Sequence, residues 1–213
     1  MTQSTGLYRF DRRTEKFEAF QHIEKDDKTI VSDQVFTVFE DNKKRIWVGT
    51  KSGVDLFDNG IYKHFKTPLS NLGVTSIIQA RNNTFLCSTT YGVYNFFETA
   101  DGSLLAKNYD MEQPGTPVTT ISYSANFCYT LLEDPNKDNF FWVATKQGLV
   151  KLDATKNQRA TIEASTTGMS NSTIYAMLFP VVTNGNHLWL GTEDGLNRYN
   201  TSTGVFERFF ADP

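Results

Sequence analysis

The 213-residue sequence lacks a long apolar run, an excess of charge of one sign and a recognisable leader. No stretch approaches the roughly 20 apolar residues that a membrane-spanning helix needs, so we expect no membrane span in this chain. The 21 basic and 24 acidic residues are scattered and give a net charge of −3, which argues against nucleic acid as a partner. The N-terminal MTQSTGLYRF does not have the charged-then-apolar layout of a signal peptide.

Cysteine and histidine are also scarce. The two cysteines, Cys87 and Cys128, lie in apolar, strand-like runs and form no CxxC pair. We predict two buried free thiols, with a disulfide between them as the open alternative. The three histidines, His22, His64 and His187, fall at unrelated positions without metal-ligand spacing. We therefore expect structural or surface roles for them, no metal site and no cofactor.

What the sequence does contain is one pattern that recurs along its whole length. The clearest copies are IWVGTKSGVDLF from Ile46, FWVATKQGLVKL from Phe141 and LWLGTEDGLNRY from Leu188. A worn copy begins at Phe85, and a copy without its first half begins at Thr5. The glycine after the first turn of each copy stands at Gly6, Gly53, Gly92, Gly148 and Gly195. A spacing of about 47 residues, with short strands cut by turns, is typical of a β-propeller blade.

The repeat predicts an all-β fold, a partial β-propeller of about four and a half four-stranded blades. We expect a single domain over residues 1–213, with a half blade over 1–34 and blades over about 35–70, 71–117, 118–165 and 166–213. In the first full blade the expected strands are Val35–Glu40, Ile46–Thr50, Val54–Phe57 and Ile61–Phe65. Residues 111–126, which contain Pro114-Gly115 and Pro117, are interpreted as an insertion.

Two apolar columns in the third strands favour a propeller over a one-sided sheet. The first column follows the turn glycine and the second stands three residues later, which places the two on opposite faces of the strand. The first column is Leu7, Val54, Val93, Leu149 and Leu196, and the second is Phe10, Phe57, Phe96, Leu152 and Tyr199. Both faces therefore bury apolar groups, as blades sandwiched between neighbours require.

Two further expectations follow from this arrangement. Small residues recur at one position of the second strand, where another backbone can approach closely; they are Gly49, Ser88, Ala144 and Gly191. A partial propeller also exposes apolar faces at both ends. We expect these faces to be covered by a second copy in a homo-oligomer, by a tighter ring or by other chains.

The pattern of an apolar residue, Trp, an apolar residue, Gly-Thr and a later Gly resembles the two-component regulator propeller repeat. Ile46–Thr50 with Gly53 and Leu188–Thr192 with Gly195 match it, and Phe141–Thr145 with Gly148 matches with Ala144 in place of Gly. The acidic pairs Glu40-Asp41 and Glu133-Asp134 match the end of the preceding strand. The unit that contains Leu86–Thr89 departs from the pattern, because it lacks both the Trp and the Gly.

The resemblance implies a fragment of the periplasmic sensor region of a hybrid two-component histidine kinase of the kind found in gut Bacteroidetes. Such proteins carry two propellers of about seven blades, a β-sandwich, a membrane helix, a kinase, a receiver and a DNA-binding domain. Members of the family sense glycans or their breakdown products and switch on polysaccharide-utilisation genes. The resemblance thus implies a non-enzymatic segment with an oligosaccharide as its possible ligand. The alternative is a propeller scaffold for protein partners, which should show a broad apolar patch on its loop face.

No constellation in the sequence indicates catalysis, so no catalytic residue is assigned. Glu40-Asp41 and Glu133-Asp134 recur at one repeat position, which favours turn residues that accept backbone N–H bonds over an acid–base pair. The threonines of the Gly-Thr position also repeat, which indicates a role in building the blade. An enzyme, the third class considered, would need a convergent acid–base pair or a metal site.

Candidate ligand residues come from the loops, because propellers carry function there. The connections between blades and the turns between second and third strands should emerge on one face, which we call the connection face. The candidates on this face are Tyr91, Tyr123, Lys51, Lys146, Glu193 and Asp194. The two tyrosines are chosen because sugars are commonly held by aromatic stacking together with polar side chains. The alternative for Tyr123 is that it packs the insertion down.

Overall fold

A computed structural model describes residues 6–58, 61–64, 69–109, 127–181 and 185–210 of the chain. Over these residues the chain forms 18 strands and one four-residue helix. The strands make four four-stranded antiparallel sheets and one two-stranded sheet. The predicted all-β fold, a partial propeller of about four and a half blades, is confirmed.

Each four-stranded sheet is a meander, because every strand pairs with the next one along the chain. The two-stranded sheet is β1 (Leu7–Asp11) and β2 (Lys16–Phe20). Blade 1 is β3 (Val35–Glu40), β4 (Ile46–Thr50), β5 (Gly53–Asp58) and β6 (Ile61–His64). Blade 2 is β7 (Val74–Gln79), β8 (Phe85–Thr89), β9 (Gly92–Glu98) and β10 (Leu104–Tyr109). Blade 3 is β11 (Cys128–Glu133), β12 (Phe140–Thr145), β13 (Leu149–Asp153) and β14 (Gln158–Ile162). Blade 4 is β15 (Ile174–Leu178), β16 (His187–Thr192), β17 (Gly195–Asn200) and β18 (Phe206–Phe209).

The helix α1 (Ala164–Thr167) was not expected from the sequence. It is a single turn in the connection between blades 3 and 4. The Oγ1 atom of Thr167 donates to the carbonyl of Glu163 at 2.6 Å, and Gly168 ends the helix in the left-handed region at φ 78°. A turn this short leaves no apolar periodicity in the sequence, so pattern reasoning does not detect it.

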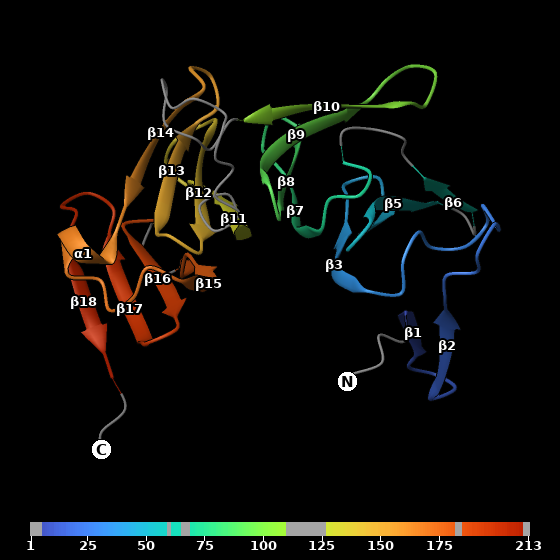
Figure 1. Ribbon diagram of the computed structural model, residues 1–213, viewed down its shortest axis with the longest axis horizontal. Coiled ribbons are helices and arrows are strands. Elements are labelled where there is room, and N and C mark those ends of the chain that lie inside the picture. The colour runs from blue at the N-terminus through green and yellow to red at the C-terminus, as the bar shows by residue number, and fades with distance from the viewer. Residues whose placement is uncertain (1–5, 59–60, 65–68, 110–126, 182–184, 211–213) are drawn as a thin grey trace.

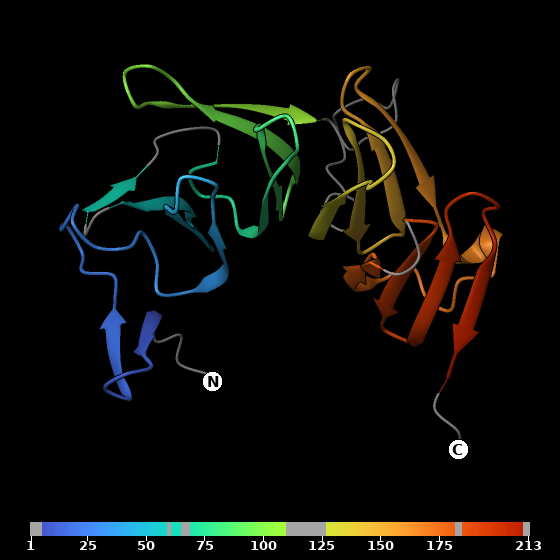
Figure 2. The ribbon, with the colours of Figure 1, turned by 180° about the vertical axis from the view of Figure 1, so that it is seen from behind.

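The blades stand side by side in an open arc, with the β1–β2 hairpin at one end and blade 4 at the other (Figures 1 and 2). The first strands β3, β7, β11 and β15 line the inside of the arc, and the fourth strands lie on the outside. Both ends of the chain lie at the open side of the arc (Figure 2).

The hydrophobic core is divided into clusters between neighbouring blades. One cluster joins Trp47 and Val54 of blade 1 to Phe96 of blade 2, and the next joins Val93 of blade 2 to Leu152 of blade 3. The third joins blade 3 to blade 4. The first apolar column thus faces the following blade and the second faces the preceding blade, as their opposite placement on the strand requires.

The two ends of the arc show what this arrangement leaves uncovered. Leu196, the first-column residue of blade 4, is 41% exposed, and Phe10, the second-column residue of the hairpin, is 47% exposed. The equivalent residues of blades 2 and 3 are buried. Within the described part of the chain, the arc therefore does not curl into a ring that covers its apolar ends.

Close approach between blades depends on the small-residue position of the second strands. A Cβ atom added to Gly49 would lie 2.7 Å from the carbonyl oxygen of Val74 in the next blade and 2.5 Å from Thr37. At the same position Ala144 is fully buried. At Gly191, in blade 4, the nearest atom would be 3.7 Å away because no blade follows. Blade 2 thus packs directly against the backbone of blade 1.

Polar groups that recur in the repeat build the turns. Thr50 Oγ1 donates to the carbonyl of Gly53 at 3.1 Å and accepts the Ser52 N–H, and the same bond to the turn glycine recurs at Thr89, Thr145 and Thr192. Asp41 accepts the backbone N–H groups of Lys43 and Arg45. These contacts match the building roles that the repeated positions indicated.

Candidate functional site

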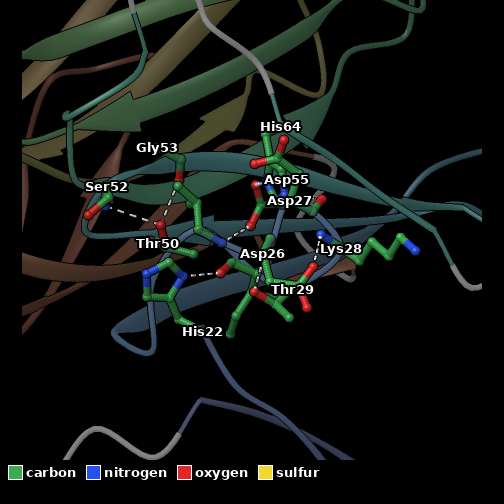
Figure 3. A network of polar contacts seen from close by, with 12 residues as sticks. His22, Asp26, Asp27, Lys28, Thr29, Thr50, Ser52, Gly53, Asp55 and His64 are labelled. Atoms are coloured by element: carbon green, nitrogen blue, oxygen red, sulfur yellow. Dashed lines mark hydrogen bonds and ion pairs between the residues drawn. The ribbon is translucent and has the colours of Figure 1, made fainter. Parts of the chain in front are cut away.

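A network of polar contacts lies where the connection between the β1–β2 hairpin and blade 1 meets strand β5 (Figure 3). Asp55 Oδ1 lies 2.7 Å from His64 Nδ1, and Asp55 Oδ2 accepts the Val31 N–H at 2.7 Å. His64 Nε2 lies 2.9 Å from the carbonyl oxygen of Asp27. His22 Nδ1 lies 2.8 Å from the carbonyl oxygen of Ile30. Together these groups fasten the connection to the blade.

A cavity of about 240 Å³ opens beside this network, lined by the connection and by the turn between β4 and β5. Its lining includes His22, Asp26, Thr29, Ser52 and His64. Thr29 Oγ1 donates to the carbonyl of Asp26, and the Asp26 side chain accepts the Lys28 N–H. The lining is therefore held largely by bonds within the connection itself.

Asp55 is the most unusual group in the network, because its carboxyl is fully buried. Burial raises the pKa of Asp55, while the hydrogen bonds from Val31 and His64 act in the opposite direction. The carbonyl of Asp27 requires a proton on His64 Nε2, so Asp55 and His64 Nδ1 share the remaining proton between them.

His64 is not available as a catalytic base. Both ring nitrogens of His64 are occupied by groups of the chain itself, so neither can accept a proton from a nearby hydroxyl. Thr50, beside the cavity, is equally committed, because its hydroxyl bridges Ser52 and Gly53. His64 and Thr50 therefore do not form the base and nucleophile pair that acyl or glycosyl transfer would need.

Blade 4 contains the same fastening with an amide in place of the carboxyl. Asn197 occupies the position of Asp55, two residues after the turn glycine, and is also fully buried. Its Oδ1 accepts the Ser170 N–H at 3.0 Å, and its Nδ2 donates to Ser170 Oγ at 2.6 Å. Ser170 and Val31 both stand four residues before the first strand of their blade. The Asp55 network is thus a structural fastening to which His64 adds a second partner.

The predicted ligand residues Lys51, Lys146 and Glu193 occupy one position in the turns between second and third strands. Their backbone N–H groups donate to the carbonyls of Gln34, Phe127 and Thr173, the residues that precede the first strands, and Thr90 does the same to Gly73. Lys51, Lys146 and Glu193 are all exposed. The structure therefore sets these three on the connection face, one blade or more apart.

The other predicted ligand residues are distributed around that face. Asp194 Oδ2 accepts a hydrogen bond from Asn171 Nδ2 at 2.8 Å. Tyr91 is half-buried, and its N–H donates to Thr89 Oγ1. Tyr123 and the rest of the proposed insertion lie outside the described residues. Lys146 comes from blade 3, and Glu193 and Asp194 come from the neighbouring blade 4.

Sequence reasoning missed two features of this face. It did not predict that His22 and His64 lie in one polar network. His22 belongs to a connection and His64 to a fourth strand, and these two segments meet only when the blade is folded. It also gave no sign that the register shifts by one residue in every first strand, at Phe36, Thr75, Tyr129 and Tyr175. A bulge is an extra residue in a pairing, so it becomes visible only when the partner strand is known.

The cysteines are free and buried, as predicted. Burial raises the pKa of Cys128 to about 12 and raises the pKa of Cys87 further. Among the described residues, no group of three or more His, Cys, Asp or Glu side chains is arranged to hold a metal ion. Over the same residues, no helix has the length and apolar character needed to cross a membrane.

Fold and turn chemistry together define the class as a β-propeller of meander blades. Residues 29–52, which include the acidic pair, Trp47 and the Gly49-Thr50 turn, match the family model of the two component regulator propeller. The resemblance seen in the sequence is thereby confirmed, and the chain carries a repeat of this family. No curated protein sequence matches the chain.

Solved structures similar to the chain share its fold at low sequence identity. One is the extracellular domain of a protein described as a one component system from B. thetaiotaomicron, with a TM-score of 0.75, 15% identity, and coverage of 99% of this chain and 29% of that chain. A second, the extracellular domain of a protein described as a hybrid two component system from the same organism, has a TM-score of 0.65, 16% identity and coverage of 83% and 24%. An ancestral GH74 enzyme has a TM-score of 0.70, 15% identity and coverage of 98% and 28%.

The chain spans less than a third of the length of these structures. Because both extracellular domains of one- and two-component systems and an enzyme are among them, the fold by itself does not decide between regulation and catalysis.

Proposed function

We propose that this chain is a non-enzymatic, ligand-sensing propeller segment of a two-component regulator, located on the periplasmic side of the membrane in its parent protein. The observation that carries the proposal is the match of residues 29–52 to the regulator propeller family. The extracellular domains with the same fold support the location. A parent protein with a histidine kinase is part of the same proposal.

The ligand we propose is an oligosaccharide, whose binding controls polysaccharide-utilisation genes. Binding can signal only if the ligand prefers one of two arrangements of the sensor region. In a propeller the interfaces between blades and between subunits can provide two such arrangements, because packed interfaces switch between discrete states. The connection face is the expected location of the site, since it carries the loops.

The engagement of both ring nitrogens of His64 supports a sensor over an enzyme, because it removes this imidazole as a base. The hydrogen bonds of Asp55 and His64 hold the chain together, so neither of these two side chains is available for proton transfer. A glycosidase would need two carboxyl groups on either side of a bound sugar.

The test is calorimetric titration of this chain with neutral and anionic oligosaccharides, with product analysis of each mixture. We expect saturable binding of at least one class, with the oligosaccharide recovered intact. Absence of binding across both classes would contradict the ligand proposal. Shortened oligosaccharides in the mixture would contradict the non-enzymatic assignment.

A further inference from the structure

The register shift in each first strand places one residue of every blade at the inner edge of the connection face. These bulge residues are Phe36 in blade 1, Thr75 in blade 2, Tyr129 in blade 3 and Tyr175 in blade 4. Bulges commonly re-aim a side chain toward a functional surface. Three of the four bulge residues are aromatic, which sets this position apart as a place to search for a ligand.

In blades 3 and 4 the bulge residues form a continuous aromatic group, which we call the aromatic shelf and define as Phe127, Tyr129 and Tyr175. The ring centroids of Phe127 and Tyr129 are 4.8 Å apart. Those of Tyr129 and Tyr175 are 4.9 Å apart with an interplanar angle of 75°. Tyr175 remains 49% exposed, so much of its ring is left to solvent.

The exposure of Tyr175 is not explained by its place in the last blade. Phe36 occupies the same position in blade 1, has blade 2 beside it, and is also 50% exposed. The ring of Phe36 lies over Gly73 of that next blade. Thr75 instead donates to the carbonyl of Cys128 at 2.6 Å. Exposed aromatic rings therefore belong to this position of the bulge and not to the end of the arc.

Polar groups border the shelf. The Glu193 N–H donates to the carbonyl of Thr173, two residues before Tyr175, and the Lys146 N–H donates to the carbonyl of Phe127. Burial raises the pKa of Tyr129, and the neighbouring Tyr175 and Glu193 add to this effect. The phenol of Tyr129 thus stays protonated and can donate a hydrogen bond. Glu193 and Asp194 supply carboxylate acceptors on the adjacent turn.

We propose that the aromatic shelf binds a neutral oligosaccharide, with one sugar ring stacked on Tyr175 and its hydroxyl groups donating to the carboxylates of Glu193 and Asp194. This inference rests on the proposed sensing function and gives it a location and a ligand class. An amphipathic ring such as tyrosine offers an apolar face together with a polar edge, which suits the C–H face and the hydroxyl rim of a sugar. Two adjacent carboxylates disfavour an anionic sugar, because like charges repel.

The geometry argues against a cationic ligand held in an aromatic cage. A cage surrounds the cation with rings that stand apart, whereas the three rings of the shelf touch one another at 4.8 and 4.9 Å. Because the rings are tilted to one another by 49° and 75°, the shelf offers the exposed ring of Tyr175 for stacking and no space between rings.

The experiment is calorimetric titration of the chain with two probes, a neutral hexasaccharide of β-1,4-linked glucose and an anionic hexasaccharide of galacturonic acid. The variants are Tyr175→Ala, which removes the ring, and Tyr175→Phe, which keeps it. Phe36→Ala is the matched control, because it removes a half-exposed ring from the same bulge position of another blade. Circular dichroism establishes that each variant is folded.

We expect the neutral hexasaccharide to bind the native chain more tightly than the anionic one. Tyr175→Ala should weaken that binding by about 10-fold or more, in line with the contribution of one stacked aromatic ring. Tyr175→Phe should remain within about threefold of the native chain, since stacking is retained, and Phe36→Ala should bind as the native chain does.

The outcomes separate the shelf from the wider function. If an oligosaccharide binds but Tyr175→Ala binds it as well as the native chain, the shelf is not the site and the sensing function stands. Preference for the anionic probe would overturn the charge argument. If neither probe binds, both the shelf and the oligosaccharide-sensing function fail.

Discussion

The buried carboxyl of Asp55 and the buried amide of Asn197 have the same structural role in blades 1 and 4. Both side chains accept a backbone N–H from the connection that precedes their blade, Val31 in one case and Ser170 in the other. Of the two groups, the carboxyl is the more costly to bury, because burial disfavours its charged form and raises the pKa of Asp55 above 3.8. The repeat itself therefore indicates which substitution this site should tolerate.

We predict that Asp55→Asn folds and keeps its stability at pH 7 within about 1 kcal/mol of the native chain or above it, because the amide can still accept the Val31 N–H. Asp55→Ala should lose about 1–3 kcal/mol, since it leaves Val31 and His64 without their buried partner. Urea denaturation followed by circular dichroism measures both changes.

The pH dependence of the stability difference between Asp55→Asn and the native chain is the control for this prediction. A carboxyl whose pKa is raised on folding contributes stability that is full below pH 3.8 and is lost as pH rises through the raised value. Asp55→Asn removes this term, so its advantage over the native chain should grow from pH 4 toward pH 7. A constant difference across that range would show that the Asp55 charge carries no cost.

A second residue-level regularity concerns the tryptophan of the repeat. Trp47 Nε1 donates to Asp41 Oδ2 at 3.0 Å, and Trp142 Nε1 donates to Asp134 Oδ2 at 2.9 Å. In blade 2 the corresponding positions are Leu86 and Ala80, so donor and acceptor are missing together. A buried indole N–H needs an acceptor. The worn copy has therefore replaced the pair by two apolar side chains.

At the level of the strand, substitutions at the small-residue position of the second strands test how closely neighbouring blades pack. Gly49→Ala should destabilise the chain by about 1–3 kcal/mol, because the new methyl group would meet the Val74 carbonyl at 2.7 Å and force blade 2 to move. Gly191→Ala is the matched control at the same repeat position, and it should change stability little because its nearest atom is 3.7 Å away. Thermal unfolding of the two variants provides the comparison. Equal losses at both sites would mean that strand propensity, and not the approach of blade 2, decides the effect.

The elements themselves could be predicted from the sequence because each turn carries its own chemistry. The glycine and threonine of the turn between second and third strands make the same bond in all four blades. The short helix, the bulges and the Asp55–His64 contact could not be predicted. They depend on which segments come into contact after the blades pack, and no local sequence pattern predicts those contacts.

The candidate site was predicted only in part for the same reason. Glu193 and Asp194 were chosen because they occupy a loop, and the structure sets them beside the aromatic shelf. Tyr129 and Tyr175 were not chosen, since both lie within strands and read as ordinary core positions. Both stand at the bulge of their first strand, and Tyr175 is exposed there.

At the scale of the whole molecule, the two ends of the arc have matching chemistry. The hairpin β1–β2 and the strands β17–β18 share glycine, leucine, arginine, phenylalanine and glutamate at the same spacing. Tyr199 of blade 4 packs its ring 5.6 Å from Trp142 of blade 3. In the hairpin the equivalent ring, Phe10, is exposed, and at the opposite end Trp189 lies in the last blade that the structure describes.

We propose that these ends pair between copies, with the Trp189 face of one chain against the Phe10 and Phe17 face of another. The 24.2 kDa chain should then show a concentration-dependent mass above that of a monomer in light scattering after size exclusion. Phe17→Glu, at a side chain 70% exposed, should shift the mass toward the monomer. Phe97→Glu, at a half-exposed ring in blade 2, is the control and should leave the mass unchanged. A monomer at every concentration would refute the pairing.

The division of the core into clusters shared only by neighbouring blades has a kinetic consequence. Each blade needs the one before it for half of its apolar cover, but no cluster joins blades that are far apart in the chain. Because each blade contacts only its neighbours, folding can start in one part of the chain and propagate to the next blade. The chain can therefore acquire its structure progressively, one blade after another, as it emerges from the ribosome.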